Sequence, residues 1–239
     1  SGGWLAALIL LIRMLAHKQT PHPLDYLLVA ALWLPIEIGL MRGVSIPPAQ
    51  GLVNPLELIG LVGLIYGYLV IREFDIGFTY RLSGEDYRVV VLDFIVFFLI
   101  AIIVGMLTGF LTIAKHMPPL SDLLIRLAAI FFFIALPEEL LFRGVIYKLL
   151  EKQFKGKHRV RTAMIVSSVI FGLAHSNNRV APFLTLEIGG RALDIPWVYV
   201  LLATIAGFFY CFVFIRTKKI TAAAAIHLLV DWAWYAFFD

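Results

Sequence analysis

Long apolar runs alternate along the chain with short segments rich in charged residues, proline or glycine. A membrane-spanning helix needs about 20 mostly apolar residues, and several runs approach or exceed that length. They cover residues 4–16, 24–41, 56–71, 89–114, 123–147, 162–175, 195–215 and 220–238. No internal repeat or long linker separates them. The pattern therefore predicts the all-α class, with residues 1–239 forming one polytopic integral membrane bundle of about eight transmembrane helices.

The composition excludes a water-soluble globule and a disordered chain. Hydrophobic residues make up 61% of the 239 residues and charged residues only 15%, with a mean hydropathy of +0.91, whereas soluble proteins carry about 25% charged residues. The net charge of +4 comes from residues in short loops, so no nucleic-acid partner is expected. The single cysteine, Cys211, lies in an apolar run, which excludes a disulfide framework.

The distribution of basic residues predicts how the spans are oriented. If all the runs cross the bilayer, their connecting segments alternate between two sides, and the cytoplasmic side is the one rich in Lys and Arg. One set of segments holds most of the 20 Lys and Arg residues, whereas the other holds only Arg42, Lys115, Arg179 and Arg191. The basic loops are therefore expected in the cytoplasm, with both ends of the chain outside.

Three apolar runs carry ionisable residues that the bilayer does not tolerate without a partner or a purpose. A charged side chain in hydrocarbon costs roughly 2.5 to 3.5 kcal/mol on insertion scales. The residues are Glu138, Glu139 and Arg143 in the fifth run, His175 in the sixth, and His227 and Asp231 in the eighth. Counted from the basic ends of their runs at about 1.5 Å per helical residue, they fall near the middle of the bilayer. This convergence predicts one buried polar site.

Helix spacing indicates different roles for these residues. Residues four apart share a face of a helix, whereas adjacent residues point about 100° apart. Glu139 and Arg143 are therefore expected to form an ion pair within their helix, which leaves Glu138 without a local cation. His227 and Asp231 are also four apart, so the carboxylate can orient the imidazole. The asymmetry favours Glu138 as the chemically active acid and Glu139 as a supporting residue.

These residue types suit hydrolysis by an activated water. A carboxylate beside an imidazole in a wet cavity can take a proton from water, and a second imidazole can stabilise the oxyanion formed at a carbonyl. Glu138, His175 and His227 supply these groups. The sequence contains neither the nucleophile elbow GxSxG nor the zinc motif HExxH. The pattern therefore favours a hydrolase that needs no covalent nucleophile.

Three motifs in the second half of the chain resemble those of a known protease family. The motifs are Glu138-Glu139-x-x-x-Arg143, Phe171-x-x-x-His175 and His227-x-x-x-Asp231. In order and approximate spacing they are similar to the motifs of the CAAX-processing and bacteriocin-processing membrane proteases, which include the Ras-converting endoprotease type. The resemblance covers residues 123–238, the motif-bearing half. Residues 1–122 are interpreted as scaffold helices of the same bundle.

The resemblance implies an intramembrane, glutamate-dependent endopeptidase whose site opens toward the cytoplasm. Carried over by position, Glu138 and His175 would activate water, and His227 with residue 231 would stabilise the oxyanion. Glu139 and Arg143 would brace their helix. The family pattern of prenyl-processing members has Asn at the last position, where this chain has Asp231. Because an ionised Asp cannot donate a hydrogen bond to an oxyanion, Asp231 must either be protonated or act only by orienting His227, and orientation is the favoured interpretation.

The implied substrate is a membrane-associated peptide or a lipidated, CAAX-like protein, prenylated or not, and no cofactor is expected. Zinc stays open as an alternative, because Glu138, His175, His227 and Asp231 are competent ligands and three with an open position suffice. A metalloprotease-like hydrolase would then use the same residues. Two further alternatives are a proton-relaying transporter and a non-catalytic membrane protein that acts in immunity by binding partners.

Overall fold

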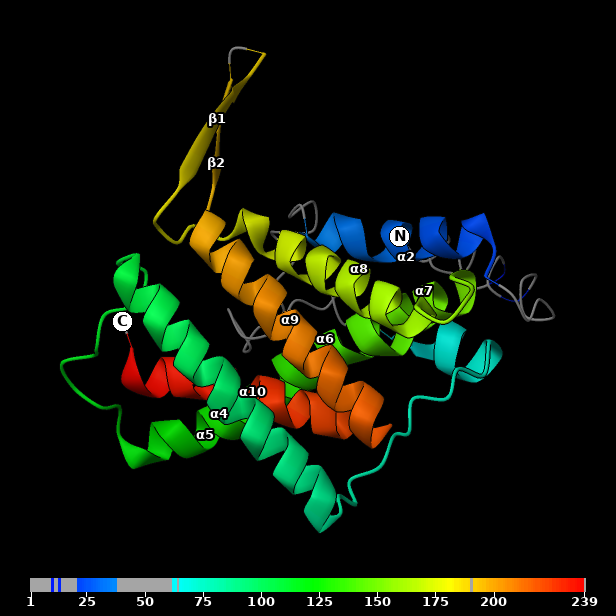
Figure 1. Ribbon diagram of the computed structural model, residues 1–239, viewed down its shortest axis with the longest axis horizontal. Helices are drawn as coiled ribbons and strands as arrows, with labels where there is room; N and C mark the ends of the chain where they lie inside the picture. Colours follow the sequence, from blue (N-terminus) through cyan, green and yellow to red (C-terminus); the bar gives the residue numbers. More distant parts are fainter. Residues whose placement is uncertain are drawn as a thin grey trace, which may run out of the picture. The chain divides into compact units, whose positions relative to one another are not determined.

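The computed structural model describes residues 21–37, 62–63, 65–189 and 191–238, together with residues 10 and 13. Most of these residues are helical (Figure 1). The elements are α2 (Pro23–Glu37), η1 (Tyr66–Ile71), α4 (Gly84–Leu107), α5 (Leu120–Ile130), η2 (Phe131–Ala135), α6 (Leu136–Glu139), η3 (Leu140–Tyr147), α7 (Lys148–Gln153), α8 (Arg159–Ala174), η4 (His175–Asn177), β1 (Leu184–Ile188), β2 (Arg191–Ile195), α9 (Trp197–Thr217) and α10 (Ile220–Phe237). The segments η1, η2 and η3 are π-helical, and η4 is a 3₁₀ turn.

The described residues divide into two compact units. Those within Ser1–Ile76 and Leu140–Ala163 form the first unit, and those within Gly77–Glu139 and Met164–Asp239 form the second. In the first unit, Arg72 Nη2 lies 3.1 Å from Asp25 Oδ2 in a buried salt bridge, and the Tyr68 hydroxyl donates to the Asp25 carbonyl oxygen. A single bundle over the whole chain stays a prediction.

Some of the described helices are long and apolar enough to cross a membrane. They are Gly84–Leu107, Leu120–Gln153, Trp197–Thr217 and Ile220–Phe237, and they correspond to the fourth, fifth, seventh and eighth predicted spans. The sixth predicted span forms α8, which has only 16 residues. The first predicted span lies outside the described residues except for residues 10 and 13, and the second and third lie outside them in part. The structure supports a mainly helical integral membrane protein, and the total of about eight spans stays a prediction.

The helix α4 begins five residues before the predicted span, because its first turn is polar and capped. Ser83 Oγ accepts from the Asp86 backbone N–H at 3.2 Å, and Asp86 Oδ2 accepts from the Ser83 N–H at 2.6 Å. This capping box satisfies N–H groups that a helix start leaves open. Lys219, which precedes α10, places Nζ 2.6 Å from Asp86 Oδ2. The ion pair joins the beginnings of α4 and α10 at one end of the second unit.

The helix α10 lies at the centre of the second unit, where it packs against α4, α5, α6 and α9. Trp232 Nε1 donates to the Leu123 carbonyl oxygen at 3.0 Å, which fastens α10 to α5. A core cluster of Phe110, Leu111, Val198 and Leu202 connects the segment after α4 to the first turns of α9. The residues that α10 turns toward α6 and α9 are thus enclosed by several elements.

The helix around Pro137 contains two wide turns. Proline has no N–H to donate, and its ring crowds the carbonyl group one turn earlier in a regular α-helix. The chain is π-helical in η2 just before α6 and in η3 just after it. Such π turns occur frequently at functional sites. Between them, the single turn α6 carries the adjacent Glu138 and Glu139.

A short antiparallel hairpin, which the sequence analysis did not predict, lies between η4 and α9 in a chain that is otherwise mainly helical, as the all-α class predicts. The strands β1 and β2 pair from Leu184 opposite Ile195 to Ile188 opposite Arg191. Gly189 adopts a φ of +58°, a conformation that glycine reaches without strain in a tight turn. The hairpin therefore joins the end of the His175 segment to the start of α9.

Candidate active site

Five of the six candidate residues lie in the second unit, where different elements bring them together. Glu138 and Glu139 lie on α6, His175 begins η4, and His227 and Asp231 lie on α10. Arg143, the sixth, lies in η3 with a side chain that is almost fully buried. The expected ion pair between Glu139 and Arg143 stays a prediction.

His227 is the centre of the carboxylate cluster and is only 3% exposed. Its Nδ1 lies 2.9 Å from Glu139 Oε1, a hydrogen bond between residues 88 positions apart in the chain. Its Nε2 lies 3.5 Å from Asp231 Oδ2 and 4.0 Å from Glu138 Oε2. The bond that fixes the imidazole therefore comes from Glu139, while Asp231 and Glu138 both face the other ring nitrogen.

His175 is held in one tautomer by the helix that precedes it. Its Nδ1 lies 2.8 Å from the Phe171 carbonyl oxygen. A carbonyl oxygen only accepts, so Nδ1 must carry the hydrogen and a neutral His175 keeps its lone pair on Nε2. The residue is half-buried and lies within Coulombic range of Glu138. His175 can therefore act as a proton acceptor at the site.

Glu138 differs from Glu139 in its surroundings, as the sequence analysis predicts. The Glu139 side chain is fully buried and bonded to His227, whereas the Glu138 side chain is 34% exposed. Within the described residues, Glu138 Oε2 accepts no hydrogen bond. Its 4.0 Å separation from His227 Nε2 is too long for a direct hydrogen bond. Although the side chain is partly exposed, Oε2 itself is buried, so a partner for this oxygen has to be a small polar molecule inside the site.

Aromatic rings, which the sequence analysis did not select, surround both imidazoles. Tyr210 stacks on His227 with ring centroids 4.6 Å apart and planes 19° apart. Tyr199 meets His175 edge to face at 5.4 Å, and Phe171 contacts both imidazoles. Eleven helical residues bring the chain back to nearly the same face, so α9 presents both tyrosines to the site. The spacing of eleven residues between Tyr199 and Tyr210 is the sequence feature that could have identified both tyrosines.

A glycine allows α8 to approach α9 closely enough for these contacts. A Cβ at Gly172 would overlap Thr204 Oγ1 and the Val200 carbonyl oxygen, both on α9. Thr204 Oγ1 itself donates to the Val200 carbonyl oxygen, so the crowded atoms cannot move apart freely. The absence of a side chain at Gly172 therefore sets the distance between the His175 segment and α9.

Gly172→Ala is expected to destabilise the folded protein by about 1 to 3 kcal/mol through overpacking and to lower Tm in detergent by several degrees. Gly84→Ala is the matched control, because nothing lies within 4 Å of a Cβ at Gly84 in the first turn of α4. Thermal unfolding of both variants checks the expectation. A Gly172→Ala protein as stable as Gly84→Ala would contradict the close packing.

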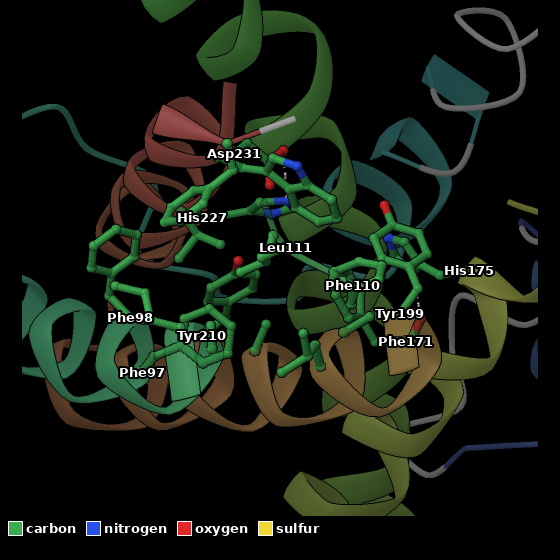
Figure 2. Close-up of a pocket in the computed structure, with 18 residues that line it drawn as sticks. Phe97, Phe98, Phe110, Leu111, Phe171, His175, Tyr199, Tyr210, His227 and Asp231 are labelled. Carbon is green, nitrogen blue, oxygen red and sulfur yellow. Dashed lines mark hydrogen bonds and ion pairs between the residues drawn. The ribbon is translucent and has the colours of Figure 1, made fainter. Parts of the chain in front are cut away.

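A largely apolar pocket adjoins the polar cluster, with a cavity volume of about 70 Å³. Figure 2 shows Tyr210 beside His227, and Tyr199 beside His175. The polar lining residues include His175, His227 and Asp231. The apolar wall comes from Phe97, Phe98, Ala101 and Ile102 of α4, Phe110 and Leu111 of the following segment, and Leu202, Ala203 and Ala206 of α9. A long apolar group can lie here with a polar bond presented to the imidazoles.

Among the residues that the structure describes, no three His, Cys, Asp or Glu side chains are grouped so as to hold a metal ion. Glu138, His227 and Asp231 lie close together, but Nδ1 of His227 is engaged by Glu139. Removal of metal with a chelator tests whether zinc takes part in the reaction.

The second half of the chain matches a known family. Residues 120–233 match the family described as type II CAAX prenyl endopeptidase, Rce1-like. The matched range begins at α5 and ends within α10, and it contains all six candidate residues. No curated protein and no solved structure is similar enough to the chain to count as a match.

Proposed function

Through residues 120–233 this chain belongs to the Rce1-like type II CAAX prenyl endopeptidase family and is a membrane protease, and from this premise we propose that it cuts prenylated, CAAX-like peptides with a water activated by Glu138 and His175. The family acts on membrane-associated prenylated proteins. The observation that carries the proposal is the carboxylate of Glu138 4.0 Å from His227 Nε2, at a cluster whose His227 and Asp231 line the same pocket as His175. It supports direct attack by water.

Water activation rests on two acceptors with different surroundings. Glu138 Oε2 accepts no hydrogen bond within the described part of the chain, and His175 keeps its Nε2 lone pair because Nδ1 donates to the Phe171 carbonyl oxygen. A water held by both groups has its two hydrogens engaged and its own lone pair directed toward the substrate. Glu138 then takes the proton as the water oxygen attacks.

Each step of the proposed hydrolysis balances without a cofactor. The water oxygen bonds to the scissile carbonyl carbon, one proton passes to Glu138, and the carbonyl π electrons move onto the oxygen. The C=O bond then re-forms, the C–N bond breaks, and the proton on Glu138 passes to the leaving nitrogen. One water is consumed, and a carboxylate and an amine are released.

His227 supports the oxyanion through Nε2, provided that the pair it forms with Glu139 holds two protons. One proton lies between Nδ1 and Glu139 Oε1, which are 2.9 Å apart. The second, on Nε2, is the one that can be donated to the oxyanion. Asp231, 3.5 Å from the same nitrogen, attracts this proton and helps to direct it. The proposed role of Asp231 is thus orientation, as the sequence interpretation has it.

The apolar pocket supports a lipidated substrate. Side chains of α4 and α9 form an apolar wall that suits an isoprenoid chain, and His175, His227 and Asp231 of the polar cluster line the same pocket. Burying a prenyl group there would hold the adjacent peptide bond near Glu138 and His175, and the binding energy of the lipid would place the reacting bond.

Ala101→Phe is expected to narrow this pocket and raise KM for a farnesylated peptide about tenfold, with kcat changed less than about threefold, because uniform binding is lost. Ala101 lies on α4 and lines the pocket. Leu99→Phe adds bulk to the same helix at a side chain that is 55% exposed and outside the pocket lining, and its KM should stay unchanged. Equal KM values for Ala101→Phe and Leu99→Phe would contradict the assignment of the pocket.

The proposed function is tested with purified protein in liposomes and matched peptides with and without a farnesyl group, followed by mass spectrometry. We expect release of the residues that follow the farnesylated cysteine and little cleavage of the unmodified peptide. Failure to cut any peptide of the panel would count against the assigned chemistry, whereas equal cleavage of both peptides would count against prenyl recognition alone.

A further inference from the structure

The proposed site has only one of the donors that an oxyanion needs. A carbonyl oxygen that becomes negatively charged is best stabilised by two or more hydrogen-bond donors. In the proposed mechanism His227 Nε2 supplies one of them, because the pair that His227 forms with Glu139 holds two protons. Asp231, the other side chain beside Nε2, is an acceptor when ionised and cannot donate. A neutral O–H or N–H group close to His227 and Asp231 would complete the site.

Tyr199 places a phenol at the same pocket. It lies in the first turn of α9, a helix that carries none of the three sequence motifs, and it lines the pocket together with His175, His227 and Asp231. Figure 2 shows it beside His175. Its hydroxyl lies within Coulombic range of both Asp231 and Glu138. The phenol thus lies near the reacting groups and not merely in the apolar wall.

The ring of Tyr199 is held on several sides. It meets the His175 ring edge to face at 5.4 Å, the Trp234 ring edge to face at 5.5 Å, and the Phe110 ring in a stacked arrangement at 5.9 Å. These contacts limit rotation of the side chain and so fix the direction of the hydroxyl. A donor fixed before the substrate binds needs no reorganisation during the reaction.

The hydroxyl itself is available. Nowhere in the described residues does it form a hydrogen bond, although the ring around it is well packed. Thr204 and Thr217 of the same helix, by contrast, both donate to carbonyl oxygens of α9. A phenol is a neutral donor with an ordinary pKa near 10, so it can donate to an oxyanion that a carboxylate would repel.

We propose that Tyr199 is a further catalytic residue, whose hydroxyl donates a hydrogen bond to the scissile carbonyl oxygen as it becomes an oxyanion. The inference rests on the proposed function and adds a second donor opposite His227 Nε2. In this chain the phenol then performs the donor role that the carboxylate of Asp231 cannot perform.

The test compares Tyr199→Phe with Tyr235→Phe in cleavage of a farnesylated peptide. Phenylalanine keeps the ring contacts of Tyr199 and removes only the hydroxyl. Loss of one oxyanion donor should lower kcat by about 10- to 100-fold and leave KM within about threefold. Tyr235 lies on α10, contacts Arg126 through its ring and does not line the pocket, so Tyr235→Phe should keep the wild-type rate. A wild-type kcat for Tyr199→Phe, or a loss confined to KM, would overturn the proposal.

Tyr199→Leu separates donation from packing on His175. If the hydroxyl acts, Phe and Leu variants that remain folded by thermal unfolding lose kcat to a similar extent. If only the ring matters, Tyr199→Phe stays active and Tyr199→Leu does not, which would contradict donation.

A binding measurement gives an answer that does not depend on turnover. A farnesylated phosphinate peptide carries a tetrahedral P–O⁻ group in place of the oxyanion. Tyr199→Phe should weaken its affinity at least about tenfold and leave the affinity of the uncleaved ketomethylene peptide unchanged. Equal weakening of both ligands, or of neither, would overturn the role of Tyr199. An inactive wild-type protein that still binds the phosphinate in a Tyr199-dependent way would instead contradict only the proposed function.

Discussion

Glu138→Gln is expected to lower kcat for a farnesylated peptide by at least about 10³-fold while the protein remains folded. Gln has the same shape as Glu but cannot take a proton from water. The wild-type Glu138 side chain is partly exposed, and Oε2 accepts no hydrogen bond from any described residue. The substitution therefore removes no hydrogen bond that Oε2 makes to the described residues, and the loss should appear in turnover and not in Tm. Initial rates and thermal unfolding, measured on the same preparation, check both parts.

Glu187→Gln is the matched control for this substitution. Glu187 lies on the exposed strand β1, outside the pocket lining, so the same chemical change there should leave kcat unaltered. If Glu138→Gln kept more than about a tenth of the wild-type rate, Glu138 could not be the principal base. Dialysis of the wild-type protein against a chelator decides the zinc alternative in the same assay. Lost activity that returns with Zn²⁺ would favour zinc.

His175→Asn should cost about 10²-fold in kcat with little change in stability. The Asn side chain retains an N–H that can donate to the Phe171 carbonyl oxygen, as His175 Nδ1 does at 2.8 Å. It lacks the second nitrogen that the mechanism uses as an acceptor. The substitution thus removes the proton acceptor and preserves the local hydrogen bond. Initial rates and thermal unfolding, measured on the same preparation, check both parts of this expectation.

His116→Asn serves as the control for His175→Asn. His116 is exposed in the segment between α4 and α5 and does not line the pocket, so its substitution should leave the rate unchanged. A His175→Asn protein with the wild-type rate would exclude His175 from water activation, and the hydrolysis would then have to rely on Glu138 alone.

The membrane-spanning helices could be predicted from the sequence, but their ends could not. The predicted span 220–238 agrees with α10, and 195–215 is close to α9. The span predicted to begin at residue 89 begins at Gly84, because the polar first turn of α4 is stabilised by Ser83 and Asp86 and not by apolar residues. Apolar run length locates the part of a helix in lipid, whereas capping determines where the helix starts.

The hairpin carried a signal that the sequence analysis did not use. Leu184, Leu186 and Ile188 alternate with Thr185 and Glu187, and a Gly-Gly pair follows before the next alternating segment. This pattern is typical of two strands and a tight turn. Neither strand forms a long apolar run, because each has only five residues.

The sequence predicts only those contacts of the candidate site that lie within one helix. The proximity of His227 and Asp231 follows from their spacing of four, and the structure places them in contact. The bond between Glu139 and His227 joins residues from α6 and α10, and no periodicity within either helix indicates it. Tyr199 was missed for the same reason. From the sequence of an apolar helix alone, a tyrosine that faces a site cannot be distinguished from one that only packs, because the elements that it faces are not known.

The central claim is that Glu138 and His175 act on one water molecule, and a double variant tests it most directly. Residues that act as a unit show losses that do not multiply. With Glu138→Gln at about 10³-fold and His175→Asn at about 10²-fold, the double variant should remain within about threefold of Glu138→Gln alone. A double variant reduced by about 10⁵-fold, the product of the separate losses, would show that the two residues act independently and would contradict the claim.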